Sequence, residues 1–397
     1  IQSTALAAAG AVLGPSCTAP GPEARSGARP FPAPCRSGAW EKHGLVLEAS
    51  EPWEGSSLQN FTCTAEPLEH GAWRLWYSVS GARERFGLAY AQGVPGGPMK
   101  KVAAQCSPGE PAAGPLTIGN LPAKWKPVQG VHLHLLNGKH RLYFWAHGPR
   151  ILRYLAAESA DGRSYRVLNP LRPVLYHPSD RAAFGVATPD GLKLHPEPSR
   201  ERPAGEPLAP SRLLSNDATN IYQLPDGSFE LYSVGLVPVR RGDPAYVAQD
   251  NAPGLLRVID RYTSADGLVF ETRQRVIQRD AQDPADQQFY YLAVTHTPTG
   301  RVGMLGHYRC QAQTMDLEWC FSRDGVAWQR PLRRAWLPRG APPAPDCYGI
   351  YGNHCLVHHA GRWPLFYTGV NEAHNGRKSY GPPRQVVLYA TTKSLWA

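Results

Sequence analysis

A pattern of three strands recurs five times along this chain of 397 residues. Each copy begins with an apolar strand, continues after a turn glycine with an aromatic-rich strand, and ends with a third apolar strand. The second strands are "GAWRLWYSVSG" at 71, "GKHRLYFWAHG" at 138, "GSFELYSVGL" at 227, "GRVGMLGHYRC" at 300 and "GRWPLFYTGVN" at 361. One such unit cannot bury its apolar surface alone, so the copies must pack against one another.

The spacing of the copies indicates the architecture. Their first strands begin at residues 59, 129, 217, 286 and 351, which gives steps of 70, 88, 69 and 65 residues. A step of this size suits one four-stranded propeller blade with its loops. Fourth strands follow the turns in "SADGRSYRVLNP", "SADGLVFETRQRVI" and "SRDGVAWQRPL", whereas the last copy ends at Ala397 without one.

An N-terminal strand is predicted to complete the last copy. "GAWEKHGLVLEAS" at 38–50 resembles a fourth strand, so we expect residues 44–49 to pair with 385–391 and close the ring. The predicted fold is therefore all-β: a five-bladed β-propeller of four-stranded blades, in a single domain over residues 35–397. A composition of 39 Gly, 39 Pro and only 3 Met agrees with short strands and many turns.

Residues 1–34 are expected to lie outside this domain, as the remnant of an export signal followed by a Pro/Gly/Ala-rich linker. The mild, Ala-rich apolar run is typical of a twin-arginine signal and predicts a periplasmic or secreted protein. Cys17 in "LGPSC" is either a lipid attachment site or a linker cysteine. No later segment has the roughly 20 apolar residues that span a bilayer.

The chain has eight cysteines, and export would permit disulfides. The most plausible local pair is Cys310 with Cys320, because "YRCQAQTMDLEWCF" reads as two neighbouring strands with one cysteine on each. The alternative is two buried free thiols.

The strand copies resemble those of the five-bladed propeller glycoside hydrolases of families 32, 43 and 117. The resemblance covers roughly residues 38–397, and "SRDGVAWQRP" with "DPADQQFYYL" resembles a bacterial branch related to family 32. It implies the propeller fold and an activity on glycans. A fold does not by itself imply a function, so the site needs its own argument.

In such a propeller the first strand of each blade starts at the central pocket, and the loop after the second strand returns to the same face. Acidic and imidazole side chains at these places are the catalytic candidates: Asp217, Asp286, Glu372 and His374. Polar side chains there are the substrate-binding candidates: Gln59, Asn60, His132, His147, Asn216, Gln288, His307, Arg309, Tyr351, His354 and Asn371. Such a pocket suits a carbohydrate, and glycoside hydrolysis needs two carboxyl groups.

Each candidate has a structural alternative. Asp217 and Asp286 could cap strand starts, and Glu372 could be a solvated loop carboxylate. His132 and His134 alternate along one strand and could hold a metal, although interior histidines are the simpler interpretation. The acidic residues of the repeated "DG" turns are expected to be structural: Asp161, Asp266 and Asp324.

The first two copies lack the carboxylates that families 32 and 43 carry there, so the resemblance does not transfer their catalytic triad. In family 117 a histidine acts as the acid, and the predicted pocket here contains several histidines. We expect a glycoside hydrolase; the alternatives are a polysaccharide lyase using His and Tyr, and a non-catalytic glycan-binding propeller.

The net charge of +10 and pI near 9.2 fit either an anionic glycan substrate or an arginine-rich solvated surface. Arginines near the predicted pocket loops are Arg83, Arg85, Arg240, Arg241, Arg309 and Arg377. Export and the lack of a binding module disfavour nucleic acid. We expect a monomer without cofactor; a structural or axial metal ion such as calcium is compatible with this fold.

Overall fold

The computed structural model describes residues 33–34, 39–55, 57–59, 64–79, 87–105, 116–121, 126–148, 151–169, 174, 187–188, 191–192, 218–239, 241–250, 253–270 and 272–396. Two compact units divide the chain, Ile1–Pro32 and Ala33–Ala397, and every described residue belongs to the second. The predictions for the export signal and Cys17 lie outside the described residues.

The second unit is all-β, and its described residues contain no α-helix. Antiparallel pairing arranges most strands in five groups. The first group is β2 (Thr64–Pro67), β3 (Trp73–Val79), β4 (Gly87–Gly93) and β5 (Lys100–Gln105). The second is β7 (Lys126–His134), β8 (His140–Gly148), β9 (Ile151–Ser159) and β10 (Ser164–Val167). The third is β13 (Asn220–Gln223), β14 (Phe229–Pro238), β15 (Leu255–Ser264) and β16 (Thr272–Ile277).

The fourth group is β17 (Gln287–Thr297), β18 (Gly300–Arg309), β19 (Thr314–Ser322) and β20 (Trp328–Gln329). The fifth is β22 (Gly349–Gly352), β23 (Trp363–Val370), β24 (Gln385–Thr392) and β1 (Glu41–Leu47). Parallel pairs connect groups: β6 (Leu116–Gly119) pairs with β5 and β10, and β19 pairs with β22. The short β21 (Ala335–Leu337) pairs with β19, and β11 (Ala187–Thr188) with β12 (Gly191–Leu192).

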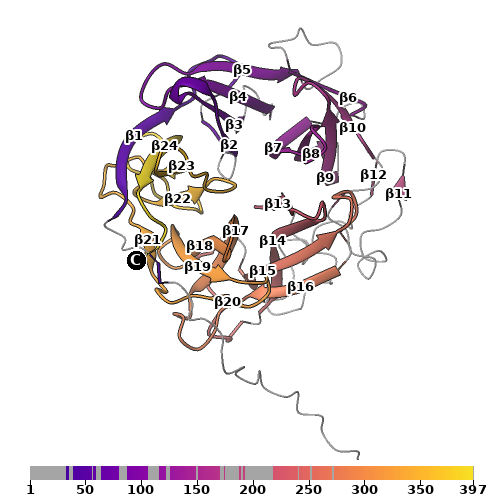
Figure 1. Cartoon of the computed structure of the whole chain (residues 1–397). Coiled ribbons are helices and arrows are strands. Elements are labelled where there is room, and N and C mark those ends of the chain that lie inside the picture. The colour runs from indigo at the N-terminus through magenta and orange to yellow at the C-terminus, as the bar shows by residue number, and fades with distance from the viewer. Residues whose placement is uncertain are drawn as a thin grey trace, which may run out of the picture. The chain divides into compact units, whose positions relative to one another are not determined.

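Figure 1 shows these groups following one another around a common centre, with β2, β7, β13, β17 and β22 innermost. The innermost strands are the first strands of the five sequence copies. The starts of these strands and the ends of the second strands therefore belong to one face of the unit, as the repeat predicted.

The N-terminal strand β1 pairs with β24, as the sequence predicted. In the β1–β24 register, Gly44 lies opposite Tyr389, Leu45 opposite Leu388 and Leu47 opposite Val387. Just before β1, Trp40 packs edge-on against Trp336 with ring centroids 4.9 Å apart. The first strand of the unit is thus an edge strand of its last group.

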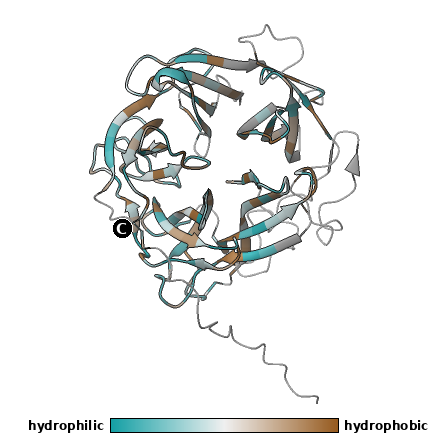
Figure 2. Cartoon of the chain, in the orientation of Figure 1, coloured by the Kyte–Doolittle hydropathy of each residue, from teal (hydrophilic) through white to brown (hydrophobic). Residues whose placement is uncertain are grey.

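Buried hydrophobic side chains are shared by neighbouring groups, and Figure 2 shows brown, hydrophobic residues on strands of every group. Five clusters join neighbouring groups, and the pairs are first–second, second–third, third–fourth, fourth–fifth and fifth–first. The fourth–fifth cluster also includes Val234 of the third group. In the last of these, Trp73 of β3 packs against Phe366 of β23 with ring centroids 5.1 Å apart. Burial of apolar surface between groups is the main stabilising contribution in such a fold.

The repeated "DG" turns are structural, as predicted. In the turn after β19, Asp324 Oδ1 accepts hydrogen bonds from the Ser322 hydroxyl and from the backbone N–H groups of Val326 and Ala327. Gly325 has a φ of +80°, which favours glycine. Asp161 and Asp266 make the same contacts after β9 and β15.

The predicted Cys310–Cys320 disulfide is wrong, because both cysteines are buried free thiols. The β18–β19 register places Arg309 opposite Thr314 but Gly303 opposite Cys320. Cys310 therefore lies at the turn of the hairpin, and Cys320 is about 20 Å further along its strand. The two cysteines lie far apart along the same hairpin, so a disulfide bond cannot join them.

Candidate functional site

Polar and aromatic side chains gather on the face where inner strands start. Arg257, in β15, donates a hydrogen bond from Nη1 to Asp250 Oδ2 at 2.7 Å and another to Gln288 Oε1 at 2.8 Å. Tyr308, near the end of β18, donates its hydroxyl to Asp250 Oδ1 at 2.7 Å. The loop after β14 thus supplies a buried carboxylate that two neighbouring strand groups hold in place.

Two tyrosine rings cover the guanidinium. Its carbon lies 4.9 Å from the ring centroid of Tyr290 and 5.3 Å from that of Tyr308. Arg257 and Asp250 are each 4% exposed, so the pair is removed from water. A buried ion pair is stable only when further hydrogen bonds surround it, and Gln288 and Tyr308 provide them.

His374 adds an imidazole from the loop after β23. Its ring centroid lies 4.9 Å from those of both Tyr290 and Tyr308. Its Nδ1 is 3.1 Å from the Tyr351 hydroxyl, and its backbone N–H donates to Gln313 O. Burial, reinforced by the charge of Arg257, lowers the pKa of His374 to about 4. At neutral pH it is an uncharged imidazole, so it can accept a proton but carries none to donate as imidazolium. We call these five residues the Arg257 cluster: Asp250, Arg257, Tyr290, Tyr308 and His374.

Asp286, the predicted carboxylate at the head of β17, is 4% exposed and ion-paired. Its Oδ1 accepts from Arg309 Nη2 at 2.6 Å and from Nε at 3.1 Å, and its Oδ2 accepts from Gln311 N at 3.2 Å. Asp286 therefore holds Arg309 and anchors the turn that follows β18.

Glu372 is half-buried in the loop after β23, where its backbone bridges to Ser379. Asn371, beside it, orders this loop: its Nδ2 donates to Tyr380 O and Pro382 O, and its Oδ1 accepts from Arg384 N. The candidates Asn60, Asn216 and Asp217 lie outside the described residues, and only the backbone of His147 is described. Gln59 is half-buried beside β3, with its backbone N–H donating to Ser78 O.

Several other candidates make interior contacts away from the Arg257 cluster. His354 Nε2 lies 2.7 Å from Ile221 O, and its ring stacks on Tyr222 with centroids 4.3 Å apart, which joins the fifth group to the third. His307 Nδ1 lies 2.9 Å from Glu318 Oε2, within a buried network that includes Arg330. His132 lies near the end of β7, whereas the Arg257 cluster forms where inner strands start.

Three residues predicted from the sequence lie in or beside this cluster, namely His374, Tyr351 and Gln288. Asp250, Arg257, Tyr290 and Tyr308 were not predicted. One signal was available: Arg257 interrupts the apolar start of the third strand in "LLRVID". A charged residue inside an apolar strand needs a buried partner. Its partner Asp250 lies in a long loop, and no local pattern identifies it.

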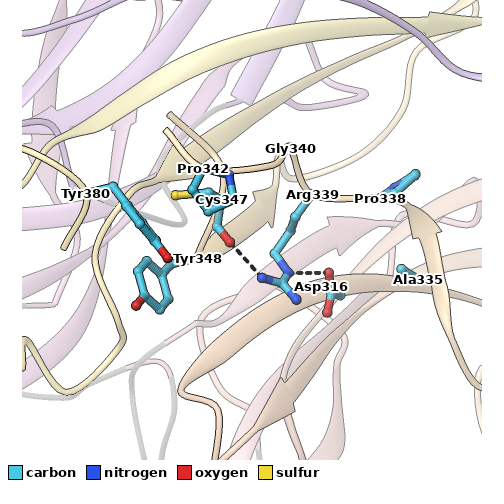
Figure 3. A pocket seen from close by; sticks show the side chains of 9 residues that line it. All are labelled: Asp316, Ala335, Pro338, Arg339, Gly340, Pro342, Cys347, Tyr348 and Tyr380. Atoms are coloured by element: carbon cyan, nitrogen blue, oxygen red, sulfur yellow. Dashed lines mark hydrogen bonds and ion pairs between the residues drawn. The ribbon is translucent and has the colours of Figure 1, made fainter. Parts of the chain in front are cut away.

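A pocket of about 500 Å³ opens between β21 and the loops before β22 and after β23. Figure 3 shows the rings of Tyr348 and Tyr380 side by side in it, with their centroids 5.6 Å apart. Arg339 donates from Nε to Asp316 Oδ1 and from Nη1 to Cys347 O, each at 2.7 Å. The pocket thus combines an exposed aromatic surface with a fixed charged pair.

The sequence matches no protein-family model and no curated protein. Solved structures are similar to it in fold. One is an N-acetylgalactosamine deacetylase from F. plautii in complex with blood group B trisaccharide, with 14% identity, coverage of 89% of this chain and 95% of that chain, and a TM-score of 0.53. Another is a thermostable family-43 glycoside hydrolase, with 11% identity, coverage of 85% and 90%, and a TM-score of 0.51.

A third is the catalytic domain of a GH62 α-L-arabinofuranosidase from Coprinopsis cinerea, with 11% identity, coverage of 91% and 98%, and a TM-score of 0.51. The expected likeness to the propeller glycoside hydrolases is therefore confirmed for the fold. The described residues form no helix of the length and apolarity that crossing a membrane requires.

Proposed function

We propose that this protein is a glycan-active enzyme and, more specifically, a glycoside hydrolase. One observation carries the proposal: three neighbouring strand groups bring carboxylates, imidazole and tyrosines to the face where inner strands start. The third group supplies Arg257, the fourth supplies Asp286 and Tyr308, and the fifth supplies His374. Sugar hydroxyls need such polar partners, and sugar ring faces pack on aromatic rings.

The proposal includes the architecture on which this face depends. The five groups are taken as the blades of one propeller, closed where β1 pairs with β24. The buried cluster shared by the fifth and first groups supports closure, since it completes a cycle of contacts between neighbours. A crystal structure with a sixth blade, or with an open gap between these groups, would contradict it.

The proposed catalytic carboxylates are Asp217 and Asp286, with Glu372 as the acid. The hydrogen bonds of Asp286 with Arg309 support a role for this carboxylate as base or nucleophile, because they hold it in a fixed orientation at the head of β17. Glu372 is half-buried and close to the Arg257 cluster in sequence, two residues from His374.

The substrate is proposed to be a poly- or oligosaccharide. Tyr348 and Tyr380 offer a surface on which a sugar ring can stack, and Arg339 beside them can contact sugar hydroxyls or a carboxylate. The overall charge of +10 supports an anionic glycan. Arg241 and Arg377 are exposed on loops of this face, whereas the charge of Arg309 is already paired with Asp286.

One observation supports each of the two alternatives, a polysaccharide lyase and a non-catalytic glycan-binding propeller. The Tyr351 hydroxyl lies 3.1 Å from Nδ1 of a neutral His374, an arrangement that suits proton abstraction by a lyase. The ion pairing of Asp286, together with the missing carboxylates of the first two copies, suits a glycan-binding propeller without catalysis.

The deciding experiment incubates the purified chain with a panel of neutral and anionic glycans and detects reducing ends and unsaturated products together. New reducing ends without unsaturation identify a hydrolase, and unsaturated products identify a lyase.

Asp217→Asn should then lower hydrolysis by about a hundredfold or more while glycan binding persists. The matched control is Asp226→Asn, in the turn between β13 and β14 at the other end of the blade. Full activity in Asp217→Asn would refute the assigned role, and binding without any product would favour the binding module.

A further inference from the structure

Three histidines converge where β7 turns into β8. His132 and His134 share a face of β7 because side chains alternate along a strand, and His140 begins β8 directly opposite His134. The ring centroids are 4.9 Å apart for His132 and His134, 5.5 Å for His132 and His140, and 4.5 Å for His134 and His140. One ring nitrogen of each lies within 4.8 Å of the others.

A carboxylate from the neighbouring strand group completes the cluster. Glu66, in β2, has Oε1 at 3.0 Å from His134 Nε2 and in close contact with His132 Nδ1. Its other oxygen, Oε2, faces Arg74 Nη1 at 3.5 Å, and the Arg74 guanidinium lies over the Tyr90 ring. The two oxygens therefore have different partners, and Oε1 is directed to the three histidines.

Two buried ring nitrogens of this cluster have no hydrogen-bond partner among the described residues. They are Nε2 of His132 and Nδ1 of His140, whereas Nδ1 of His132 faces Glu66 Oε1. His132 is 1% exposed, with its ring stacked on Trp76 at 4.3 Å, so bulk water does not reach it. Leaving buried polar atoms unsatisfied is costly, and such atoms indicate a missing water or ion.

We propose that Glu66, His132, His134 and His140 bind a divalent transition metal ion, with Zn²⁺ as the ion to test. Three imidazole nitrogens and one carboxylate oxygen form a tetrahedral donor set that suits zinc. With Zn–N bonds of about 2.0–2.1 Å, the rings of tetrahedral ligands have centroids about 5 Å apart. The three observed separations, between 4.5 and 5.5 Å, bracket that value.

The ion has a structural role. Four protein ligands close the coordination sphere, which is typical of structural zinc. Among the described strands, β2 pairs only with β3, so the ion would cross-link this short strand of the first group to the β7–β8 hairpin of the second. His134 provides a route from solvent, since its side chain is 56% exposed. This metal site is distinct from the Arg257 cluster, whose residues belong to the third, fourth and fifth groups.

The test uses the full chain, stripped of metal with a chelator and desalted. Titration calorimetry with Zn²⁺ should show one tight site per chain, and the unfolding midpoint should rise when one equivalent is added. His134→Ala and His140→Ala should each weaken this binding at least about tenfold. His70→Asn is the matched control: His70 is an exposed histidine with φ of +56°, a conformation that Asn tolerates.

Folding of the variants is checked by circular dichroism, and His134→Ala removes a partly exposed side chain that no core contact requires. Co²⁺ in place of Zn²⁺ should give the intense visible absorption of tetrahedral cobalt in the wild type and in His70→Asn, and lose it in His134→Ala. The proposal is overturned if wild type takes up no more Zn²⁺ than a His134→Ala/His140→Ala double variant, or if folded His134→Ala binds Zn²⁺ as tightly as wild type.

Discussion

Two buried histidines in this protein, His354 and His374, have a pKa below the ordinary value for histidine. His354 is buried between the third and fifth groups, where its Nε2 faces Ile221 O and its ring stacks on Tyr222. Burial lowers the pKa of His354 to about 4, from an ordinary value of 6.5. His374 shares this lowered pKa in the Arg257 cluster. Burial therefore disfavours the protonated form of both histidines.

These lowered pKa values predict how stability depends on pH. Because the folded state disfavours the imidazolium, the unfolded state binds the proton first as the pH falls below 6.5. The contribution of His354 is therefore complete above pH 6.5 and is lost as the pH falls toward 4, a loss on the order of 3 kcal/mol. Urea denaturation of wild type and His354→Gln across this window measures it. The glutamine keeps a donor for Ile221 O but does not titrate, so the difference between the two proteins should change with pH. A constant difference would contradict the assignment.

At the scale of elements, one carboxylate joins four strands of two groups. Glu230 of β14 is fully buried and contacts Arg261 of β15, His296 of β17 and Arg301 of β18. Burial raises its pKa, but the hydrogen bonds from His296 and Arg301 outweigh that effect and lower the pKa to about 2. The ionised Glu230 therefore stabilises the contact between the third and fourth groups at neutral pH.

We predict that Glu230→Gln destabilises the protein by about 3 kcal/mol, since it leaves two mostly buried arginines without their counter-charge. The matched control is Glu48→Gln: Glu48 pairs with Arg384 at 2.9 Å, but both side chains are about half exposed. An exposed pair contributes less than about 1 kcal/mol. Chemical denaturation at pH 7 compares the two variants, and equal losses would show that the Glu230 network contributes no more than a surface pair.

On the scale of the whole molecule, the two ends of the second unit stabilise each other. Pro34 bridges to Trp396, β1 pairs with β24, and Trp40 packs on Trp336. Trp40 and Leu47 are both buried although most of β1 is exposed. Residues before the first strand copy therefore belong to the core of the last group.

Two truncations test this arrangement. A chain that starts at Ala33 should melt like the full chain, because the Ala/Gly/Pro-rich composition of residues 1–32 predicts no contribution to a hydrophobic core. A chain that starts at Ser50 should lose at least about 4 kcal/mol, because it lacks the Trp40 contact and exposes the edge of β24. Thermal unfolding of both proteins gives the measurement. A large drop for the first would show that residues 1–32 contribute to stability, and no drop for the second would show that the pairing of β1 with β24 does not.

The sequence alone determined the strand repeat and the "DG" turns, because alternation and turn chemistry act over a few residues. The missing fourth strand of the last copy identified the partner of the N-terminal strand. The repeat also placed His374, Tyr351 and Asp286 on the face where inner strands start. Only the tertiary structure decided which side chains meet across groups: Arg257 with Asp250, and Glu66 with His132 and His140. It likewise separated Cys310 from Cys320 along their hairpin. Those contacts depend on strand register and on packing between groups, and neither is written in the local pattern of any single strand.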